Sequence, residues 1–182
     1  MSVGAYFGSP ASGGWLALFL AVVIAQRVVE LAVSSRNTRK LRAAGAIEHG
    51  AGHFPLLVAV HVLFPVSLVL EVFFFGARPG GLWPFWLALW LAAQVLRYAA
   101  VSALGPRWSV GIWVLPRAPL VRRGPYAHMR HPNYTAVVIE LLAGPMIFGA
   151  WRTALAISVL DFFALRIRAR AEERALATTY AR

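Results

Sequence analysis

The chain has 182 residues, of which 59% are hydrophobic and only 14% are charged. A soluble domain carries about 25% charged residues, so this composition argues against a soluble globular domain and against a disordered chain. Lysine and arginine outnumber aspartate and glutamate by 18 to 7, and these cations gather between long apolar runs, which indicates contact with a membrane surface and not with nucleic acid. Cysteine is absent, which excludes disulfides, thiolate metal sites and cysteine nucleophiles.

The apolar residues fall into five runs. The first 14 residues carry no charge, so the basic start of a secretory signal is missing and we expect no cleaved signal peptide. The runs follow at 15–33, 54–75, 83–104, 134–151 and 153–167. The first three are long enough to cross a ~30 Å hydrocarbon layer as helices. The last two are shorter and predict a tight helical hairpin that crosses a thinned bilayer or inserts only partly.

We therefore expect one all-α integral membrane domain over residues 1–182. It is predicted to have about five transmembrane helices, near 15–35, 54–75, 83–104, 133–150 and 153–180, of which the last two cross fully or insert only partly. Fourteen of the 18 basic residues follow the first, third and fifth runs, and only Arg78 and Arg152 lie on the opposite side. Because basic loops stay in the cytoplasm, we expect the N-terminus outside and the C-terminus inside.

Several charged residues lie inside the apolar runs, where charge is costly. Arg27 and Glu30 are three residues apart on one helix and are predicted to pair. Arg97 and Asp161 are deeper in their runs, and we expect them to pair between helices. Glu71 is close to the outer end of the second run and is expected to reach the headgroups.

Three histidines, His49, His53 and His61, follow one another at spacings of four and eight residues, which resembles a metal-binding face. Gly50 and Gly52 weaken any helix there, and no carboxylate stands at a matching spacing. The pattern therefore favours packing or interface histidines, and we expect no metal.

The first of two polar segments rich in chemistry covers residues 120–134. Gly124-Pro125 is a turn signal. Pro132 fits the first turn of a helix, because its missing N–H costs nothing there. His131, Pro132 and Asn133 are thus predicted at the N-terminus of the fourth helix, whose free N–H groups suit a ligand carboxylate or ribose hydroxyls.

The second segment, residues 161–176, predicts a helix with two different faces. At about 100° per residue, the stripe expected to meet the bundle contains Asp161, Leu165, Arg168, Glu172, Leu176 and Thr179. The opposite face is predicted to be solvated and to bind headgroups, and it holds Arg166, Arg170, Glu173 and Arg174. Arg168 and Glu172, four residues apart, form either a salt bridge within the helix or part of a site.

Together the two segments resemble the isoprenylcysteine carboxyl methyltransferase superfamily, which also includes phospholipid N-methyltransferases. The matching motifs are Gly124-Pro-Tyr126, Arg130-His-Pro-Asn-Tyr134 and Arg168-x3-Glu172-Glu173, and the match covers about the last 70 residues. The resemblance implies an all-helical membrane enzyme that uses S-adenosylmethionine without a Rossmann domain. In keeping with this, no Gly-x-Gly-x-x-Gly loop after a strand is found.

The resemblance also implies roles for single residues. Residues expected to touch the cofactor, in a cytoplasmic pocket, are Pro119, Leu120, Val121, Tyr126, His131, Pro132, Asn133, Tyr134 and Glu172. Arg168 matches the position that meets the reactive group of the acceptor. A family histidine just before the turn corresponds to Ala118 or its neighbours, which is a departure from the pattern.

A further set of segments is similar to a bacterial branch found beside type III polyketide synthases. The segments that carry this likeness are 45–49, 105–109 and 131–140, with His53-Phe-Pro and His61. That branch methylates hydroxyls of alkylresorcinols or alkylpyrones, so the expected acceptor is a phenolic or enolic lipid and the expected location is the bacterial cytoplasmic membrane. Membrane lipids are expected partners, and nucleic acid is not.

The chemistry leaves alternatives open. A phenol has an ordinary pKa of roughly 10, so a base would help to remove its proton. Glu140 is the candidate base, and the alternative is that Glu140 is the structural partner of a buried arginine. Arg168 would orient the acceptor oxygen, and Glu172 would hold the cofactor's amino or ribose groups. Other hypotheses are carboxyl methylation of a prenylated thiol compound, phospholipid N-methylation, and a small membrane carrier or scaffold.

Overall fold

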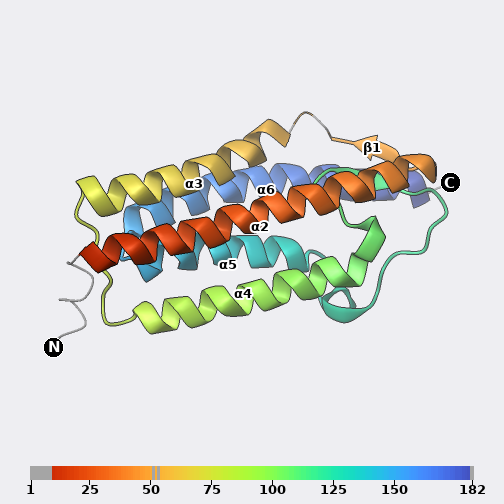
Figure 1. The fold of residues 1–182 in the computed structure, drawn as a ribbon. Coiled ribbons are helices and arrows are strands. Elements are labelled where there is room, and N and C mark those ends of the chain that lie inside the picture. Colours follow the sequence, from red (N-terminus) through yellow and green to blue (C-terminus); the bar gives the residue numbers. More distant parts are fainter. Residues whose placement is uncertain (1–9, 51, 53, 181–182) are drawn as a thin grey trace.

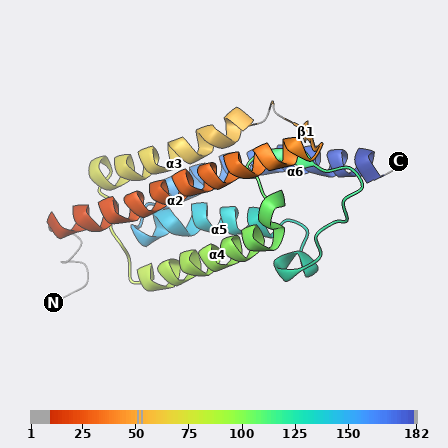
Figure 2. The ribbon, with the colours of Figure 1, turned by 45° about the vertical axis from the view of Figure 1, so that its right-hand side comes forward.

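Five long helices lie side by side in an elongated bundle (Figure 1 and Figure 2). The structure is a computed structural model that describes residues 10–50, 52 and 54–180. The helices are α2 (Pro10–Ala43), α3 (Phe54–Phe74), α4 (Trp83–Leu104), α5 (Pro132–Ile147) and α6 (Trp151–Tyr180). The predicted all-α membrane class is confirmed, and the helix positions follow the five apolar runs.

The first helix is longer than predicted. It was expected to end near residue 35, but α2 continues to Ala43. Residues 34–43 contain no glycine or proline, so nothing in that stretch interrupts the helix. The chain turns only at Gly45, whose φ of +82° suits glycine. The basic cluster after the first run therefore lies on a helix and not in a loop.

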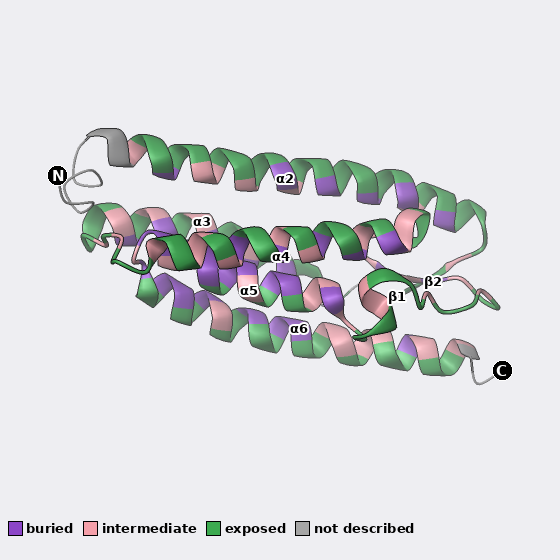
Figure 3. Ribbon diagram, turned by 90° about the horizontal axis from the view of Figure 1, so that it is seen from below, coloured by how far each residue is buried: buried purple, intermediate pink, exposed green. Residues whose placement is uncertain are grey.

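Three of the helical segments are long and apolar enough to cross a membrane, namely Gly13–Ala43, Phe54–Phe74 and Trp83–Arg107. Many large apolar side chains on the outer faces of the helices are exposed (Figure 3), including Val28, Phe73 and Val95. Such an apolar surface marks contact with lipid in a bundle of this kind. The most buried helix is α5, which has 16 residues and packs among the others.

A tight turn joins α5 to α6 and is held by α3. Gly149 has a φ of +70°, and a Cβ there would lie 1.9 Å from the backbone oxygen of Arg78. The carboxylate of Glu71 accepts hydrogen bonds from the backbone N–H groups of Arg152 (3.1 Å) and Thr153 (2.6 Å). Glu71 is only 3% exposed, so the prediction that it reaches the headgroups was wrong. It instead satisfies the free N–H groups at the start of α6.

Four charged side chains form what we term the buried ion cluster, which joins α2, α4 and α5: Arg27, Glu30, Arg97 and Glu140. Arg27 lies 2.8 Å from Glu30, as predicted, and 3.1 Å from Glu140. Arg97 lies 2.5 Å from Glu140 and 3.5 Å from Glu30. The cluster has two positive and two negative charges, and each is paired between helices.

The expected partner of Arg97 was wrong. Asp161 is 1% exposed, and neither of its carboxylate oxygens has a hydrogen-bond partner among the described residues. Arg97 pairs with Glu140 of α5 and Glu30 of α2 instead. Periodicity placed Asp161 on the inner face of α6 correctly, but it could not tell which carboxylate Arg97 would meet.

At the end of the bundle that carries the C-terminus, two short strands pair antiparallel (Figure 1). They are β1 (Ile47–His49) and β2 (Ile112–Val114), which the sequence did not predict. Two single turns of 3-10 helix also lie there, η2 (Gly105–Arg107) and η3 (Gly124–Ala127). The side-chain amide of Asn37 donates to the backbone oxygens of Gly105 (3.2 Å) and Trp108 (2.8 Å). These bonds fix the start of the long α4–α5 connection against α2.

The structure describes two of the three histidines, His49 and His61. His49 lies in β1, and the Nδ1–H of His61 donates to the backbone oxygen of Leu57 at 2.8 Å. His53 lies outside the described residues. Within residues 10–50, 52 and 54–180, no group of three metal-ligating side chains is placed to hold an ion.

Candidate functional site

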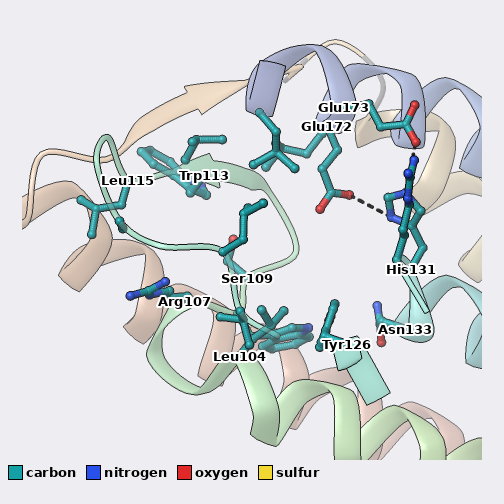
Figure 4. Close-up of a pocket in the computed structure, with 18 of the residues that line it drawn as sticks. Leu104, Arg107, Ser109, Trp113, Leu115, Tyr126, His131, Asn133, Glu172 and Glu173 are labelled. Carbon is teal, nitrogen blue, oxygen red and sulfur yellow. Dashed lines mark hydrogen bonds and ion pairs between the residues drawn. The ribbon is translucent and has the colours of Figure 1, made fainter. Parts of the chain in front are cut away.

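A cavity of about 710 Å³, here called the terminal cavity, opens at the end of the bundle that carries β1 and β2. Its walls come from the ends of α2 and α4, from η2, β2 and η3, from the α4–α5 connection, and from α5 and α6. In Figure 4, Glu172, Glu173 and His131 gather at one end, and Trp113 and Leu115 lie at the other. The volume is in the range of small-molecule and cofactor sites.

The connection from α4 to α5 forms one wall and is held by two arginines. Arg107 donates to the backbone oxygen of Pro119 at 2.6 Å, and Arg123 donates to the backbone oxygen of Ala103 at 2.9 Å. These bonds hold the connection beside the end of α4. Pro119, Leu120 and Val121, predicted from the resemblance to touch a cofactor, all line the cavity.

The start of α5 forms the next wall, as the His-Pro pattern predicted. His131 is the N-cap, and its backbone oxygen accepts from the N–H groups of Tyr134 and Thr135 at 3.1 Å each. His131, Asn133 and Tyr134 line the cavity, whereas Pro132 is fully buried and does not line it. Pro132 therefore shapes the helix start behind the cavity lining.

Asn133 carries an unused acceptor. Its Oδ1 is buried and has no hydrogen-bond partner among the described residues. Leaving such an atom unpaired costs about 1–3 kcal/mol. Asn133 lines the terminal cavity, so a rotation of its side chain would present this acceptor to a ligand that donates an N–H or O–H there.

The two faces of α6 are arranged as predicted. Asp161 and Leu165 are buried, Arg168 and Glu172 are half-buried, and Arg166, Arg170 and Arg174 are exposed. Arg168 and Glu172 both line the cavity. They are not joined directly, as a salt bridge within the helix would require, but through the hydroxyl of Tyr134. That hydroxyl accepts from Nε of Arg168 at 2.8 Å and donates to Oε2 of Glu172.

His131 adds a second link between α5 and α6. Its ring stacks on the ring of Tyr134, with centroids 5.0 Å apart and planes 4° from parallel. Nδ1 lies 3.8 Å from Oε2 of Glu172, and Nε2 lies 3.4 Å from Oε1 of Glu173. Figure 4 shows both glutamates directed toward His131. Glu173, which the sequence placed on the solvated face, therefore takes part in the cavity wall.

Two tyrosines keep their protons in this setting. Burial, and then the nearby Glu172 carboxylate, raise the pKa of Tyr126 well above its ordinary value. Burial and Glu172 likewise raise the pKa of Tyr134, although Arg168 opposes the shift. Both side chains therefore act as neutral phenols, able to donate and accept hydrogen bonds.

The comparisons with known proteins single out the same part of the chain. Residues 86–178, which contain most of α4 and the whole of the connection, α5 and most of α6, match the isoprenylcysteine carboxyl methyltransferase (ICMT) family. The chain belongs to this family. The ICMT family is one of membrane methyltransferases, and the apolar helices agree with an integral membrane protein.

Two relatives extend the likeness over nearly the whole chain. The uncharacterized protein YpbQ of Bacillus subtilis (strain 168) is 39% identical over 159 residues, which is 87% of this chain and 95% of YpbQ. An uncharacterized protein of Haemophilus influenzae is 29% identical over 157 residues, which is 86% of this chain and 91% of that protein. No solved structure matches the chain.

Within this ICMT-family chain, Glu140 lies apart from the cavity lining. It is two helical turns beyond Asn133, or about 10 Å along α5, and its carboxylate binds Arg97 and Arg27. Both arginines pair with it inside the buried ion cluster. The structure therefore favours its rival role as a structural pair over that of a base.

Some residues that line the cavity were not expected from the sequence. They are Leu104 at the end of α4, Arg107 of η2, Trp108 and Ser109 directly after η2, Trp113 of β2, and Leu115 directly after β2. The sequence did carry a signal, because two tryptophans lie in this otherwise basic connection. Periodicity cannot assign such a segment, since it forms neither a long helix nor a long strand.

Proposed function

We propose that this protein transfers a methyl group from S-adenosylmethionine to an oxygen of a lipophilic acceptor, and that the acceptor is a phenolic or enolic lipid. The observation that carries the proposal is the convergence of the family-matched segments on one cavity with a polar and an apolar part. Arg168, Glu172, His131 and Asn133 form the polar part. Such a cavity suits a polar cofactor beside an apolar substrate.

The cavity residues fit the cofactor by their chemistry. S-adenosylmethionine supplies a methyl group activated by its sulfonium sulfur. The unpaired Oδ1 of Asn133 suits an amino group, and the carboxylate of Glu173 suits an ammonium group or ribose hydroxyls. The neutral phenol of Tyr126 and the apolar residues 119–121 suit the faces of an adenine ring.

The acceptor would use the apolar part of the cavity. Leu104, Trp108 and Leu115 offer contact to an alkyl chain, and Arg168 stands where an acceptor oxygen would receive its hydrogen bonds. By holding both reactants in one place and keeping water out, this chain would supply much of the rate by positioning alone.

The same reasoning supports a location and an orientation. The terminal cavity lies at the end of the bundle where the basic residues of α2, of the connection and of α6 gather. Basic ends stay in the cytoplasm, where a soluble cofactor is available. We therefore place the cavity at the inner face of a bacterial cytoplasmic membrane, with the C-terminus inside.

Carboxyl methylation of an isoprenylcysteine-type substrate is the second candidate. A free guanidinium edge can bind a carboxylate with two parallel hydrogen bonds, and the terminal nitrogens of Arg168 have no hydrogen-bond partner among the described residues. Phospholipid N-methylation is less favoured, because the positive guanidinium of Arg168 repels the positively charged amine of such a headgroup. A carrier is less favoured too, because the charges inside the bundle are mostly paired with one another.

The experiment is a transfer assay with purified protein in lipid nanodiscs and S-adenosylmethionine labelled in its methyl group. An alkylresorcinol, an alkylpyrone, an isoprenylcysteine analogue and phosphatidylethanolamine are offered separately. We expect label in the alkylresorcinol or the alkylpyrone. Label only in the isoprenylcysteine analogue would move the proposal to the second candidate, and no label in any acceptor would reject it.

A further inference from the structure

Atoms of Arg168 and Glu172 remain free although both side chains are firmly held. Tyr134 uses only Nε of Arg168 and Oε2 of Glu172. The two terminal nitrogens of Arg168 and Oε1 of Glu172 have no hydrogen-bond partner among the described residues. Both residues line the terminal cavity, so the free donors and the free acceptor belong to the same cavity wall.

The way Tyr134 is bound shows what this pair does to a phenol. A guanidinium N–H donates to the phenolic oxygen, while a carboxylate accepts the phenolic proton. Tyr134 itself keeps its proton, because burial and the charge of Glu172 raise its pKa although Arg168 opposes the shift. A reacting hydroxyl held by the same pair would find in Glu172 a carboxylate that can take its proton and in Arg168 a cation that stabilises the oxyanion.

We infer that Glu172 is the proton acceptor for a phenolic or enolic substrate, that Arg168 stabilises the resulting oxyanion, and that Tyr134 is the positioning residue that holds both side chains. This inference rests on the proposed function and deepens it. It gives Glu172 a role toward the acceptor, in place of the cofactor contact that the resemblance implied. It also leaves Glu140 free of any catalytic role.

The step balances in atoms and charge. The O–H bond of the acceptor breaks and its proton binds Oε1 of Glu172. The electron pair left on the acceptor oxygen forms the new bond to the methyl carbon, while the pair of the broken carbon–sulfur bond stays on sulfur. The positive charge of the sulfonium and the negative charge of Glu172 are thus both cancelled. The side chain of Glu172 is 33% exposed, so water can remove the proton afterwards.

The inference separates two classes of acceptor. A phenol with a pKa near 10 needs the carboxylate at neutral pH, whereas an acceptor that is already ionised needs only Arg168. Loss of Glu172 should therefore lower the kcat/KM for the weakly acidic acceptor far more than the kcat/KM for the strongly acidic one. Loss of a cofactor contact would instead lower kcat/KM by the same factor for both acceptors.

The test compares an alkylresorcinol with a ring-fluorinated alkylresorcinol of the same chain length, whose hydroxyls are more acidic. For Glu172→Gln we expect kcat/KM to fall by about 100-fold or more with the alkylresorcinol, and by less than about 10-fold with the fluorinated acceptor. Tyr134→Phe should show the same acceptor dependence with a smaller loss, of about 10-fold, because it removes the bonds that orient the pair. The matched variant is Glu173→Gln, which removes the same charge one residue along the helix and should change both acceptors alike.

Thermal unfolding and titration with S-adenosylmethionine accompany each variant. If Glu172→Gln lowers kcat/KM by the same factor with both acceptors and also weakens cofactor binding, Glu172 is a cofactor residue. The inference is then overturned, while the proposed function stands. If Glu172→Gln does not fold, an equal loss with both acceptors in Tyr134→Phe overturns it. If the wild-type protein methylates neither acceptor, the inference and the proposed function fall together.

Discussion

Arginine and glutamate meet in two places in this molecule, the buried ion cluster and the terminal cavity, and the two differ in how many polar atoms are paired. In the cluster, Arg27, Glu30, Arg97 and Glu140 all have partners of opposite charge within 3.5 Å. In the cavity, Arg168, Glu172 and Asn133 each keep an atom without a hydrogen-bond partner among the described residues.

The difference shows how similar residues can serve opposite purposes. Charges removed from water are stable only when they compensate one another, so the cluster is a closed unit that fixes α2, α4 and α5 relative to each other. Unpaired atoms beside a cavity have a cost that a ligand can recover. Changes in the cluster should therefore act on stability first, and changes in the cavity should act on binding and rate.

The largest effect is expected when the cluster is unbalanced. Glu140→Leu leaves two guanidinium groups facing one carboxylate inside the bundle, and breaking a buried pair in this way costs about 3–5 kcal/mol. We expect a strongly lowered unfolding temperature in detergent micelles, followed by tryptophan fluorescence.

The double variant Arg97→Leu with Glu140→Leu is the matched control. It removes one charge of each sign and leaves Arg27 paired with Glu30, so it should be more stable than Glu140→Leu alone. A double variant that is no more stable than the single one would show that packing, and not charge balance, dominates at this site.

A smaller effect of a different kind is expected at Asn133. Replacing it with leucine removes the unpaired Oδ1, so the unfolding temperature should stay the same or rise. The affinity for S-adenosylmethionine, measured by titration calorimetry, should fall about tenfold, which is ~1.4 kcal/mol. Unchanged affinity would mean that Asn133 does not contact the cofactor and that its unpaired acceptor has another use.

The smallest effect concerns Tyr126 and is visible only at high pH. The pKa of Tyr126 is raised by burial and by Glu172, so above about pH 10 the unfolded chain releases this proton while the folded chain keeps it. The stability that Tyr126 contributes is thus present below about pH 10 and is lost as the pH rises further. Tyr126→Phe should lose less stability than the wild type when unfolding is compared between pH 8 and pH 11. Parallel curves for the two proteins would show that Tyr126 ionises normally.

Part of the site could be predicted from the sequence because its rules are local. A proline is favoured at the first position of a helix, so the position of His131 and Asn133 at the N-terminus of α5 followed from three adjacent residues. The inner stripe of α6 followed from a period of 3.6 residues, which placed Arg168 and Glu172 together. The exposed Arg166, Arg170 and Arg174 followed from the same rule.

The contacts between distant residues could not be predicted in this way. Tyr134 is 34 residues from Arg168 and 38 from Glu172, and its bridging role depends on how α5 is rotated against α6. Glu71 caps the start of α6 from 81 residues away. The choice of Glu140 over Asp161 as the partner of Arg97 likewise depends on the depth and rotation of three helices.

The sequence by itself determined that this is a membrane protein and where its five helices lie. It also determined which face of α6 turns inward and which end of the bundle is basic. Each of these features depends on the apolar or charged character of neighbouring residues. Only the tertiary structure decided which charges neutralise one another and which remain open to a ligand. The physical reason is that an ion pair or hydrogen bond requires two groups within about 3–4 Å, and such distances are set by the packing of whole helices and not by any single stretch of the chain.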